Sequence, residues 1–361
     1  MAISRVTFEA TPNIALIKYW GKRDESLILP TGSSLSITLD ENLTTRTTVS
    51  FSEAYTEDEL WINGHKVDLT ESESKERLKQ LDVIRKKAGI KTKAKIASIN
   101  CFPTSAGFAS SAAGLAALAC AASKAAGLKL NSSELSILAR MGSGSASRSV
   151  YGGFVKWQAG EKQDGSDSIA IQVASSEHWP EIRDIMAVVD AGKKKVSSRS
   201  GMKQTILTSK LYQERLRHWE SNCKEMERAV LAKDFQKLAE LTIRDSNNMH
   251  ATMLDTYPPI FYMNDHSRDV VYALNELNEK EGKLICGYTF DAGPNCHVIT
   301  TSQYEKKVRE ALQKIKGVKD ILVSGVGSGP KQLDKGHLID ENGEVLKATF
   351  DPKKKQIVIK Q

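Results

Sequence analysis

The segment Pro103-Thr-Ser-Ala-Gly-Phe-Ala-Ser-Ser-Ala-Ala113 leads directly into an alanine-rich stretch that continues to about Ala126. Strong helix formers predict a helix from Ala109, and the small residues before it predict a tight loop. The first turn of a helix carries unpaired backbone N–H groups and a partial positive charge. Because Gly107 lets the backbone approach a ligand closely, this helix start is suited to a phosphate group.

More common phosphate-binding patterns are absent from the sequence. It contains no G-x-x-x-x-G-K-[ST] segment, and no G-x-G-x-x-G segment follows a predicted strand. Small residues at a helix start can also serve only close packing against a sheet. Both interpretations, phosphate loop and packing contact, remain open on this segment alone.

The composition is typical of a globular protein with one large domain or two fused lobes. The 361 residues are 40% hydrophobic and 26% charged. The chain has no run of 18 apolar residues, and its N-terminus has no apolar signal region, so we expect neither a membrane span nor a leader. The five cysteines form no C-x-x-C pair and are typical of reduced thiols, which favours a cytoplasmic location.

The net charge of +7 is spread along the chain, with short runs at 193–195 and 353–355. Nucleic acid is a possible partner for a basic protein, but no basic stripe interleaved with aromatic residues occurs. A small polyanionic substrate accounts for the excess of positive charge as well as nucleic acid does, and a solvated surface accounts for most of that excess. We therefore expect neither a nucleic acid nor a membrane as partner.

Local patterns predict an alternation of strands and helices. Strands are expected at 5–9, 35–39, 44–51, 94–101, 153–158, 169–174, 185–189, 284–290, 296–300 and 321–324. Helices are expected at 75–87, 109–126, 131–140, 211–232, 235–253, 265–281 and 304–315. Asn-Gly pairs predict hairpins at 59–68 and 336–360. Polar segments 142–153 and 191–205 predict loops.

Three further motifs accompany the opening segment. They are Ala10-Thr-Pro-Asn-Ile-Ala-Leu-Ile-Lys-Tyr-Trp-Gly-Lys22, Gly142-Ser-Gly-Ser-Ala-Ser-Arg-Ser149 and Phe290-Asp-Ala-Gly-Pro-Asn-Cys-His297. In this order, the set resembles the mevalonate diphosphate decarboxylase family. That family belongs to the superfamily of galactokinase, homoserine kinase, mevalonate kinase and phosphomevalonate kinase. The resemblance extends over residues 5–329.

The resemblance implies an α+β fold with two lobes. Residues 1–190 would form a ribosomal protein S5 domain 2-like lobe, with a left-handed β-α-β unit around the phosphate loop. Residues 191–361 would form a ferredoxin-like lobe that carries Asp291 and a terminal hairpin. Family analogy also implies a homodimer.

The implied activity is ATP-dependent decarboxylation of mevalonate 5-diphosphate. The C3 hydroxyl would be phosphorylated first, and the products would be isopentenyl diphosphate, CO₂, ADP and phosphate. The resemblance makes Asp291, Lys18 and Arg148 the catalytic residues. Without it, Asp291 is typical of a turn residue, Lys18 and Lys22 of a surface pair, and Arg148 of a solvated side chain in a flexible loop.

The resemblance also implies binding roles. The substrate would be bound by Tyr19, Lys22, Ser143, Ser145, Arg148 and Thr205. ATP would be bound by Ser105, Gly107, Ala109, Ser110, Ser111, Ser198 and Arg199. Mg²⁺ would enter with ATP, held mostly by phosphates and waters, with Ser111 as the protein group that touches it. Ala109 stands where the kinases of the superfamily usually have glycine, which is itself a decarboxylase-like feature.

Four alternative functions stay open at this point. A decarboxylase acting on mevalonate 5-monophosphate would share the catalytic residues and differ in its phosphate pocket. A 3-kinase would phosphorylate without decarboxylation, although Asp291, Lys18 and Arg148 together favour the decarboxylating enzymes. A binding or regulatory protein would have lost catalysis on the same fold. An RNA-binding protein would show retention on RNA that falls steeply with salt.

Overall fold

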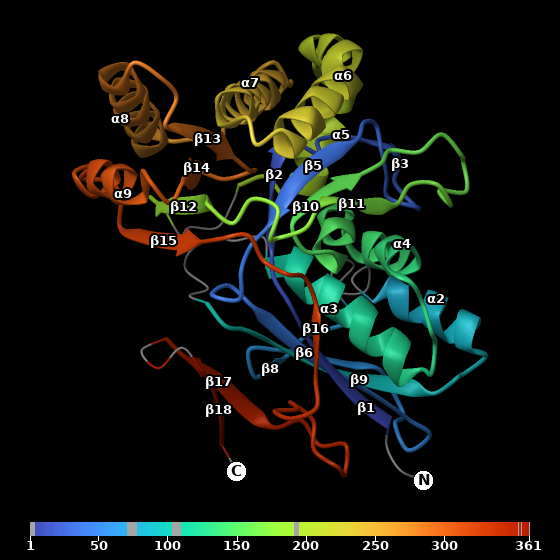
Figure 1. Cartoon of the computed structure of the whole chain (residues 1–361). Coiled ribbons are helices and arrows are strands. Elements are labelled where there is room, and N and C mark those ends of the chain that lie inside the picture. Colours follow the sequence, from blue (N-terminus) through green and yellow to red (C-terminus); the bar gives the residue numbers. More distant parts are fainter. Residues whose placement is uncertain are drawn as a thin grey trace.

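The computed structural model describes residues 4–70, 78–102, 110–190, 195–352, 354 and 356–360. Within this part of the chain, three sheets of four or more strands are covered by helices (Figure 1). None of the helices formed by the described residues is both long and apolar enough to cross a bilayer.

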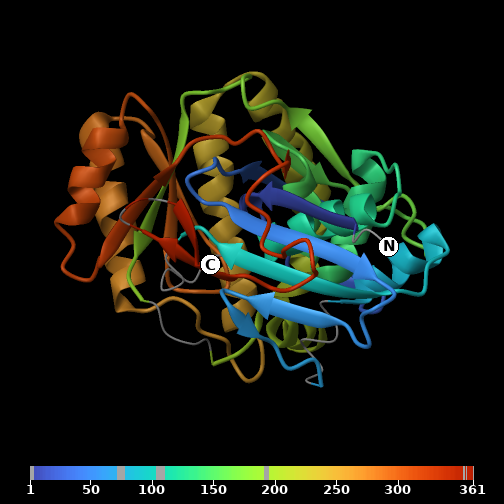
Figure 2. The same ribbon diagram turned by 90° about the horizontal axis from the view of Figure 1, so that it is seen from below.

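The first sheet has six strands. Their order is β16 (Lys331–Leu333), β1 (Ser4–Ala10), β6 (Thr45–Ser52), β9 (Lys93–Asn100), β7 (Glu59–Ile62) and β8 (His65–Lys66). The predicted hairpin at 59–68 is confirmed, because Asn63 and Gly64, both at positive φ, join β7 to β8. Figure 2 looks onto this sheet, with the C-terminal segment crossing it.

Helices cover the other face of the first sheet. They are α2 (Lys79–Ala88), α3 (Ser110–Ala125) and α4 (Ser132–Gly142), and the alanines of α3 let it pack closely on β1 and β6. The predicted start of α4 is confirmed. The Asn131 side chain accepts a hydrogen bond from the backbone of Glu134, and the Glu134 side chain accepts one from the backbone of Asn131.

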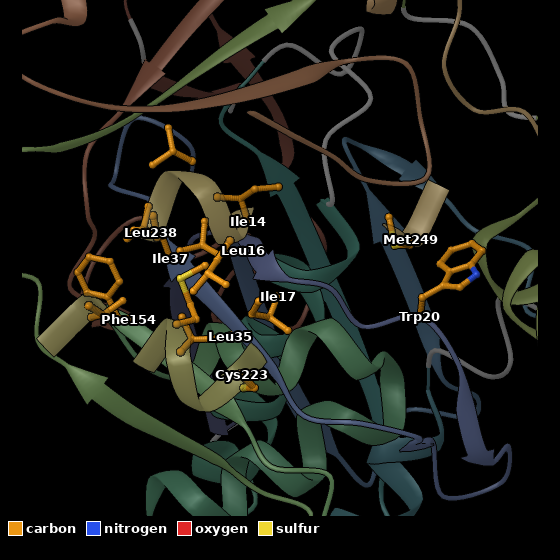
Figure 3. Close-up of a cluster of buried hydrophobic side chains, with 14 of the residues drawn as sticks. Ile14, Leu16, Ile17, Trp20, Leu35, Ile37, Phe154, Cys223, Leu238 and Met249 are labelled. Atoms are coloured by element: carbon orange, nitrogen blue, oxygen red, sulfur yellow. The ribbon is translucent and has the colours of Figure 1, made fainter. Parts of the chain in front are cut away.

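The second sheet has two strands that are buried along their whole length. Its order is β11 (Ala170–Ala174), β10 (Phe154–Trp157), β5 (Ser34–Thr38) and β2 (Asn13–Ile17), and every residue of β5 and of β2 is buried. Two long helices, α6 (Leu211–Leu231) and α7 (Phe235–Leu254), contribute to the same core. Figure 3 shows this cluster around Ile14, Leu16 and Leu35.

The third sheet belongs mostly to the C-terminal half. Its order is β13 (Cys286–Phe290), β14 (Cys296–Thr301), β12 (Ile182–Val188) and β15 (Asp320–Ser324). Helices α8 (Asp265–Glu281) and α9 (Glu305–Gln313) pack on it through a separate apolar cluster. The apolar face of each helix was visible in the sequence as a period near 3.6.

Strand pairing crosses residue 190 in both directions. The strand β12 precedes that residue but pairs with β14 and β15, whereas β16 follows it and pairs with β1. The division into lobes at residues 1–190 and 191–361 therefore stays a prediction. The strands β2 and β16 were not predicted, and neither was the short pair β3 (Lys22–Asp24) and β4 (Leu29–Pro30).

Three local predictions need correction. The predicted hairpin around Asn342-Gly343 is only a turn with one bridge, because the Asp340 carboxylate caps it by accepting from Asn342 and Glu344. The paired strands lie further on, as β17 (Lys347–Asp351) and β18 (Gln356–Lys360).

The two predicted loops also contain helices. The segment 142–153 includes the 3₁₀ helix η2 (Gly144–Val150), and the segment 191–205 includes the start of α5 (Ser198–Thr208). In the second case the Ser197 hydroxyl caps the helix by accepting from the backbone of Ser200.

Candidate active site

Lys18 and Asp291 meet at the ends of two strands from different sheets. Lys18 follows β2 and Asp291 follows β13, and Lys18 Nζ lies 2.6 Å from Asp291 Oδ1. The lysine side chain is 2% exposed, whereas the carboxylate is 46% exposed. A buried ammonium needs a partner, and this partner keeps one side open to a ligand. The arrangement is suited to hold an ionised carboxylate beside a reacting hydroxyl.

Arg148 is buried rather than solvated, so the interpretation of a mobile surface arginine is wrong. Its Nε donates to Asn13 Oδ1 at 3.1 Å and its Nη1 donates to Ser34 Oγ at 2.6 Å. Burial lowers the pKa of the guanidinium to about 10, and the charge of Asp291 opposes that shift. The group is therefore still cationic at neutral pH. Because both hydrogen-bond partners are neutral, its charge is available to an anionic ligand.

The Tyr19 hydroxyl is buried, and among the described residues it has no hydrogen-bond partner. The ring packs edge-on against Trp157 with centroids 4.9 Å apart. Burial raises the pKa of Tyr19 well above its usual value, and the charge of Glu25 adds to the shift. The hydroxyl thus stays protonated, and a buried donor without a partner is costly unless a ligand accepts from it.

Replacing Tyr19 by phenylalanine has opposite expected effects on the free and the bound protein. Loss of the unpaired hydroxyl should raise the free energy of unfolding of the ligand-free protein by about 1 kcal/mol. The KM for the anionic substrate should rise about 10-fold, because a hydrogen bond to a charged group is lost. Thermal melting and steady-state kinetics check both effects. Lower stability with an unchanged KM would mean that the hydroxyl serves the fold alone.

A cavity of about 520 Å³ lies near Tyr19, since Glu25 and Arg199, whose charges act on the Tyr19 hydroxyl, are part of its wall. The cavity is strongly basic. It is lined by Lys22, Glu25, Ser26, Ile28, Lys79, Met141, Arg199, Ser200 and Lys203. Lys22 Nζ pairs with Glu25 Oε2 at 2.5 Å, and Arg199 Nη2 donates to the carbonyl of Gly142 at 2.9 Å. With four cations and one carboxylate, the cavity is suited to a small polyanion.

Two cations of this cavity were missed in the sequence. Lys203 lies four residues after Arg199 on α5, so recognition of that helix would have placed both on one face. Lys79 begins α2, and no local signal ties it to the other residues. The structure also brings Arg199, predicted to bind ATP, to the same cavity as Lys22, which was predicted to bind the substrate.

The remaining predicted polar residues differ in their surroundings. Ser143 and Ser145 lie beside Arg148, and their hydroxyls are 3.2 Å apart. Ser198 is the first residue of α5, next to Arg199. Thr205, predicted to bind the substrate, is fully buried, and its hydroxyl accepts from Trp20 Nε1 and bonds Thr256 Oγ1. Its hydrogen-bonding capacity is used inside the core, which favours a structural role over a ligand contact.

A second, smaller cavity of about 170 Å³ lies between the six-stranded sheet and α3. Its lining combines apolar side chains with polar ones, the latter being Thr45, Thr47, Ser98, Asn100 and Ser111. Ser111 belongs to the first turn of α3, so the cavity lies next to the predicted phosphate-binding helix start. An apolar slot with a few polar groups is suited to a flat heteroaromatic ring.

The predicted phosphate loop before α3 falls outside the part of the chain that the structure describes. Ser105, Gly107 and Ala109 lie outside the described residues, as does the side chain of Ser110. Among the residues that are described, no group of three histidine, cysteine, aspartate or glutamate side chains could hold a metal ion. A divalent cation held mainly by the phosphates of a nucleotide, with Ser111 nearby, fits this donor set.

Comparisons with known proteins identify the family of this chain. Residues 10–170 match the family described as diphosphomevalonate decarboxylase-like N-terminal domain, and residues 185–320 match the mevalonate 5-diphosphate decarboxylase C-terminal domain. The chain belongs to the diphosphomevalonate decarboxylase family. The family prediction made from the motifs is thereby confirmed.

Individual relatives cover nearly the whole chain. The diphosphomevalonate decarboxylase of Gibberella zeae is 43% identical over 92% of this chain and 98% of its own length. The diphosphomevalonate decarboxylase of Rattus norvegicus is 46% identical over 82% of this chain and 76% of its own length. The crystal structure of mevalonate diphosphate decarboxylase from Staphylococcus aureus superposes with a TM-score of 0.86, at 38% identity, over 92% of this chain and 98% of that one.

A further structure, of MDDEF in complex with MVAPP, AMPPCP and magnesium, has a TM-score of 0.84 at 38% identity, and covers 92% of this chain and 100% of that one. These neighbours confirm the predicted α+β fold of the small-molecule kinase superfamily.

His250 of α7 lies directly behind the Lys18–Asp291 pair. It is buried, its ring meets Phe290 edge-on with centroids 6.0 Å apart, and among the described residues its Nε2 has no partner. Burial and, to a smaller extent, the charge of Lys18 lower the pKa of His250 to about 4. The imidazole is therefore neutral at physiological pH, and it adds no charge next to the carboxylate.

The buried imidazole makes stability depend on pH. The unfolded chain binds a proton at His250 below about pH 6.5, whereas the folded protein does so only below about pH 4. Stability is lost as pH falls between these values, by about 2 kcal/mol from pH 7 to pH 5. Urea unfolding of wild type and His250→Gln is measured at both pH values. The free energy of unfolding should fall less in the variant than in the wild type, by that amount. An equal fall in the two proteins would mean that His250 is not the origin of the pH dependence.

Proposed function

We propose that this protein catalyses the ATP-dependent decarboxylation of mevalonate 5-diphosphate to isopentenyl diphosphate, CO₂, ADP and phosphate. The observation that carries the proposal is the buried Lys18 paired with a half-exposed Asp291, in a family whose members bear this activity in their names. The nearby Arg148 is cationic and, within the described part of the chain, bonded to the neutral side chains of Asn13 and Ser34, so it supplies the anion-binding charge that such a substrate requires.

Asp291 acts as the general base in the first step. Its carboxylate orients the tertiary C3 hydroxyl and accepts the proton, while the hydroxyl oxygen attacks the γ-phosphorus of ATP and ADP leaves. Lys18 keeps the carboxylate ionised and offsets the negative charge that develops around it. Its burial prevents water from weakening that interaction.

Arg148 acts in the second step. Its guanidinium holds the carboxylate of the substrate and thereby fixes the torsion about C2–C3. The 3-phosphate then leaves with the electrons of its C–O bond, and positive character develops at C3. The electrons of the bond between C2 and the carboxylate form the new double bond, and CO₂ departs.

The basic cavity accommodates the diphosphate. Lys22 and Arg199 lie in its wall, with Lys203 one turn further along α5. The Tyr19 hydroxyl, which is influenced by the charges of Arg148 and Arg199, donates to a phosphate oxygen. Ser143 and Ser145 add hydroxyl donors beside Arg148. Thr205 has no part in this binding set.

ATP occupies the small cavity against α3 with its base and the start of that helix with its phosphates. The partly polar lining of the cavity offers donors and acceptors to the edge of an adenine. Mg²⁺ would enter bound to the phosphates of ATP, and the Ser111 hydroxyl would be the protein group that touches it. Ser198 remains a candidate ATP contact, at the N-terminus of α5.

We also propose a cytoplasmic homodimer. Exposed apolar side chains gather where α5 and α6 meet the segment after α7, namely Leu207, Leu211, Leu254, Tyr257 and Phe261. Exposed apolar side chains grouped in this way are typical of a protein interface. Sedimentation equilibrium of wild type and of Tyr257→Glu tests whether a second copy of the chain covers these side chains. If the wild type and the variant are both monomeric, the proposal is contradicted.

The deciding experiment measures ADP and CO₂ together. The purified protein is incubated with ATP and Mg²⁺, once with mevalonate 5-diphosphate and once with the 5-monophosphate. Equal amounts of ADP and CO₂ from the diphosphate alone support the proposal. The same ratio from the monophosphate alone would establish the other decarboxylase, and ADP without CO₂ would establish a 3-kinase.

A further inference from the structure

Two neighbouring residues of α7 hold the backbone on both sides of the Lys18–Asp291 pair. Asp245 Oδ2 accepts from the backbone N–H of Lys18 at 2.7 Å, and Ser246 Oγ accepts from the backbone N–H of Phe290 at 3.0 Å. Phe290 is the residue before Asp291. Since the two strands belong to different sheets, α7 is the element that they share at this point; it contacts both β2 and β13 (Figure 1).

On the lysine side, the backbone group needs a partner because β2 ends at Ile17. The regular pairing of β2 with β5 is already interrupted before that residue. A buried carboxylate takes over, and Arg215 holds it through Nη1–Oδ1 and Nη2–Oδ2 contacts of 3.1 and 3.2 Å. The guanidinium of Arg215 stacks 4.4 Å from the ring centroid of Trp219, which fixes its plane.

On the aspartate side, the hydroxyl of Ser246 binds the last residue of β13. Ser246 is fully buried, so no water can replace it. His250, one turn further along α7, packs against the ring of Phe290. The peptide that leads into Asp291 is thus held from the same helix as the peptide of Lys18.

We propose that Asp245 and Ser246 are positioning residues that set the distance between Lys18 Nζ and Asp291 Oδ1. The proposal rests on the proposed function, in which that pair reacts with the substrate. The two residues are adjacent on one rigid helix, so a change at either shifts one strand end relative to the other. A displacement of a few tenths of an ångström lowers the chemical rate and leaves substrate binding to other residues.

The Ser246 side of the proposal has a matched control on the same helix. Thr242 is also fully buried, but among the described residues its hydroxyl donates to the carbonyl of Leu238, which belongs to α7 itself. We expect Ser246→Ala to lower kcat by about 10- to 100-fold with KM for ATP and substrate changed less than 2-fold. Thr242→Val removes a buried hydroxyl too, and should keep the wild-type kcat. Melting temperatures of both variants show that the assays compare folded protein.

The Asp245 side is tested by two double variants that differ by one oxygen-bearing group. Replacing Asp245 alone would leave Arg215 buried without its carboxylate and could unfold the protein. In Asp245→Asn/Arg215→Met, the asparagine oxygen can still accept from the N–H of Lys18. In Asp245→Leu/Arg215→Met it cannot, although leucine has the same branching of its heavy side-chain atoms. We expect the first variant to have at least a 10-fold higher kcat than the second, at equal KM.

The outcomes separate the inference from the function on which it rests. Lys18→Met and Asp291→Asn are assayed in parallel. If these two lose activity while Ser246→Ala and the leucine double variant keep wild-type kcat, the positioning role is wrong and the proposed function stands. Equal losses in Thr242→Val and Ser246→Ala would also overturn it, since both would reflect general destabilisation. Full activity of Asp291→Asn would overturn both proposals.

Discussion

Asp291→Asn is expected to lower kcat by at least about 10³-fold while the protein stays folded and binds both substrates. The amide oxygen can still accept from Lys18 Nζ, which lies 2.6 Å from the native carboxylate, so the local packing is kept. What is lost is the base that accepts the hydroxyl proton and the negative charge that balances Lys18. Coupled assays of ADP and CO₂, with melting temperatures, check the result.

The control for this variant is the same substitution at an aspartate outside the candidate active site. Asp164 lies on an exposed turn and accepts from the backbone of Ser166. Asp164→Asn should keep the wild-type kcat, so any loss in Asp291→Asn reflects its site. Near-normal turnover of Asp291→Asn would contradict the assignment of the catalytic base.

Arg148→Met is expected to lower the rate of CO₂ release by about 10²-fold or more, while the affinity for ATP stays close to wild type. The side chain is buried and bonded to Asn13 and Ser34, so methionine fills the volume but cannot hold a carboxylate. If phosphorylation is less impaired than cleavage, ADP will exceed CO₂, which would identify the step that needs the guanidinium.

Arg140 provides the matched control for this substitution. It is as deeply buried, but its guanidinium donates to the carbonyls of Leu27, Gly165 and Ser168, all of which belong to the fold. We expect Arg140→Met to lower the melting temperature with little change in kcat of the folded protein. A loss of ATP affinity in Arg148→Met equal to its loss of rate would instead place Arg148 at the nucleotide.

Local chemistry determined which parts of the structure could be predicted. The Asn63-Gly64 turn needs positive φ at both positions, and the Asn131–Glu134 capping box lies within four residues, so each is visible in a short window. The strand β2 was not among the predicted elements, although Ile14–Ile17 is an uninterrupted apolar run. The turn and the capping box depend on neighbours in sequence, and they were predicted correctly.

Features that depend on distant partners could not be predicted. The burial of Arg148 depends on Asn13 and Ser34, more than one hundred residues away, and small polar residues alone indicated a loop. The cation Lys79 reaches the basic cavity through the packing of α2, which no local pattern encodes. The resemblance to a family identified Lys18 and Asp291, but the helix that holds their backbones became visible only in three dimensions.

The pairing of β16 with β1 has a consequence for synthesis of the chain. Thr7 lies opposite Leu333, so one edge of the first sheet is completed by a segment made more than three hundred residues after it. Until the ribosome has passed that point, β1 presents an open strand edge that can pair with other nascent chains. Contacts this distant also form slowly. The growing polypeptide therefore has a long interval of vulnerability to aggregation, and its yield in cells will depend on chaperones that shield this edge.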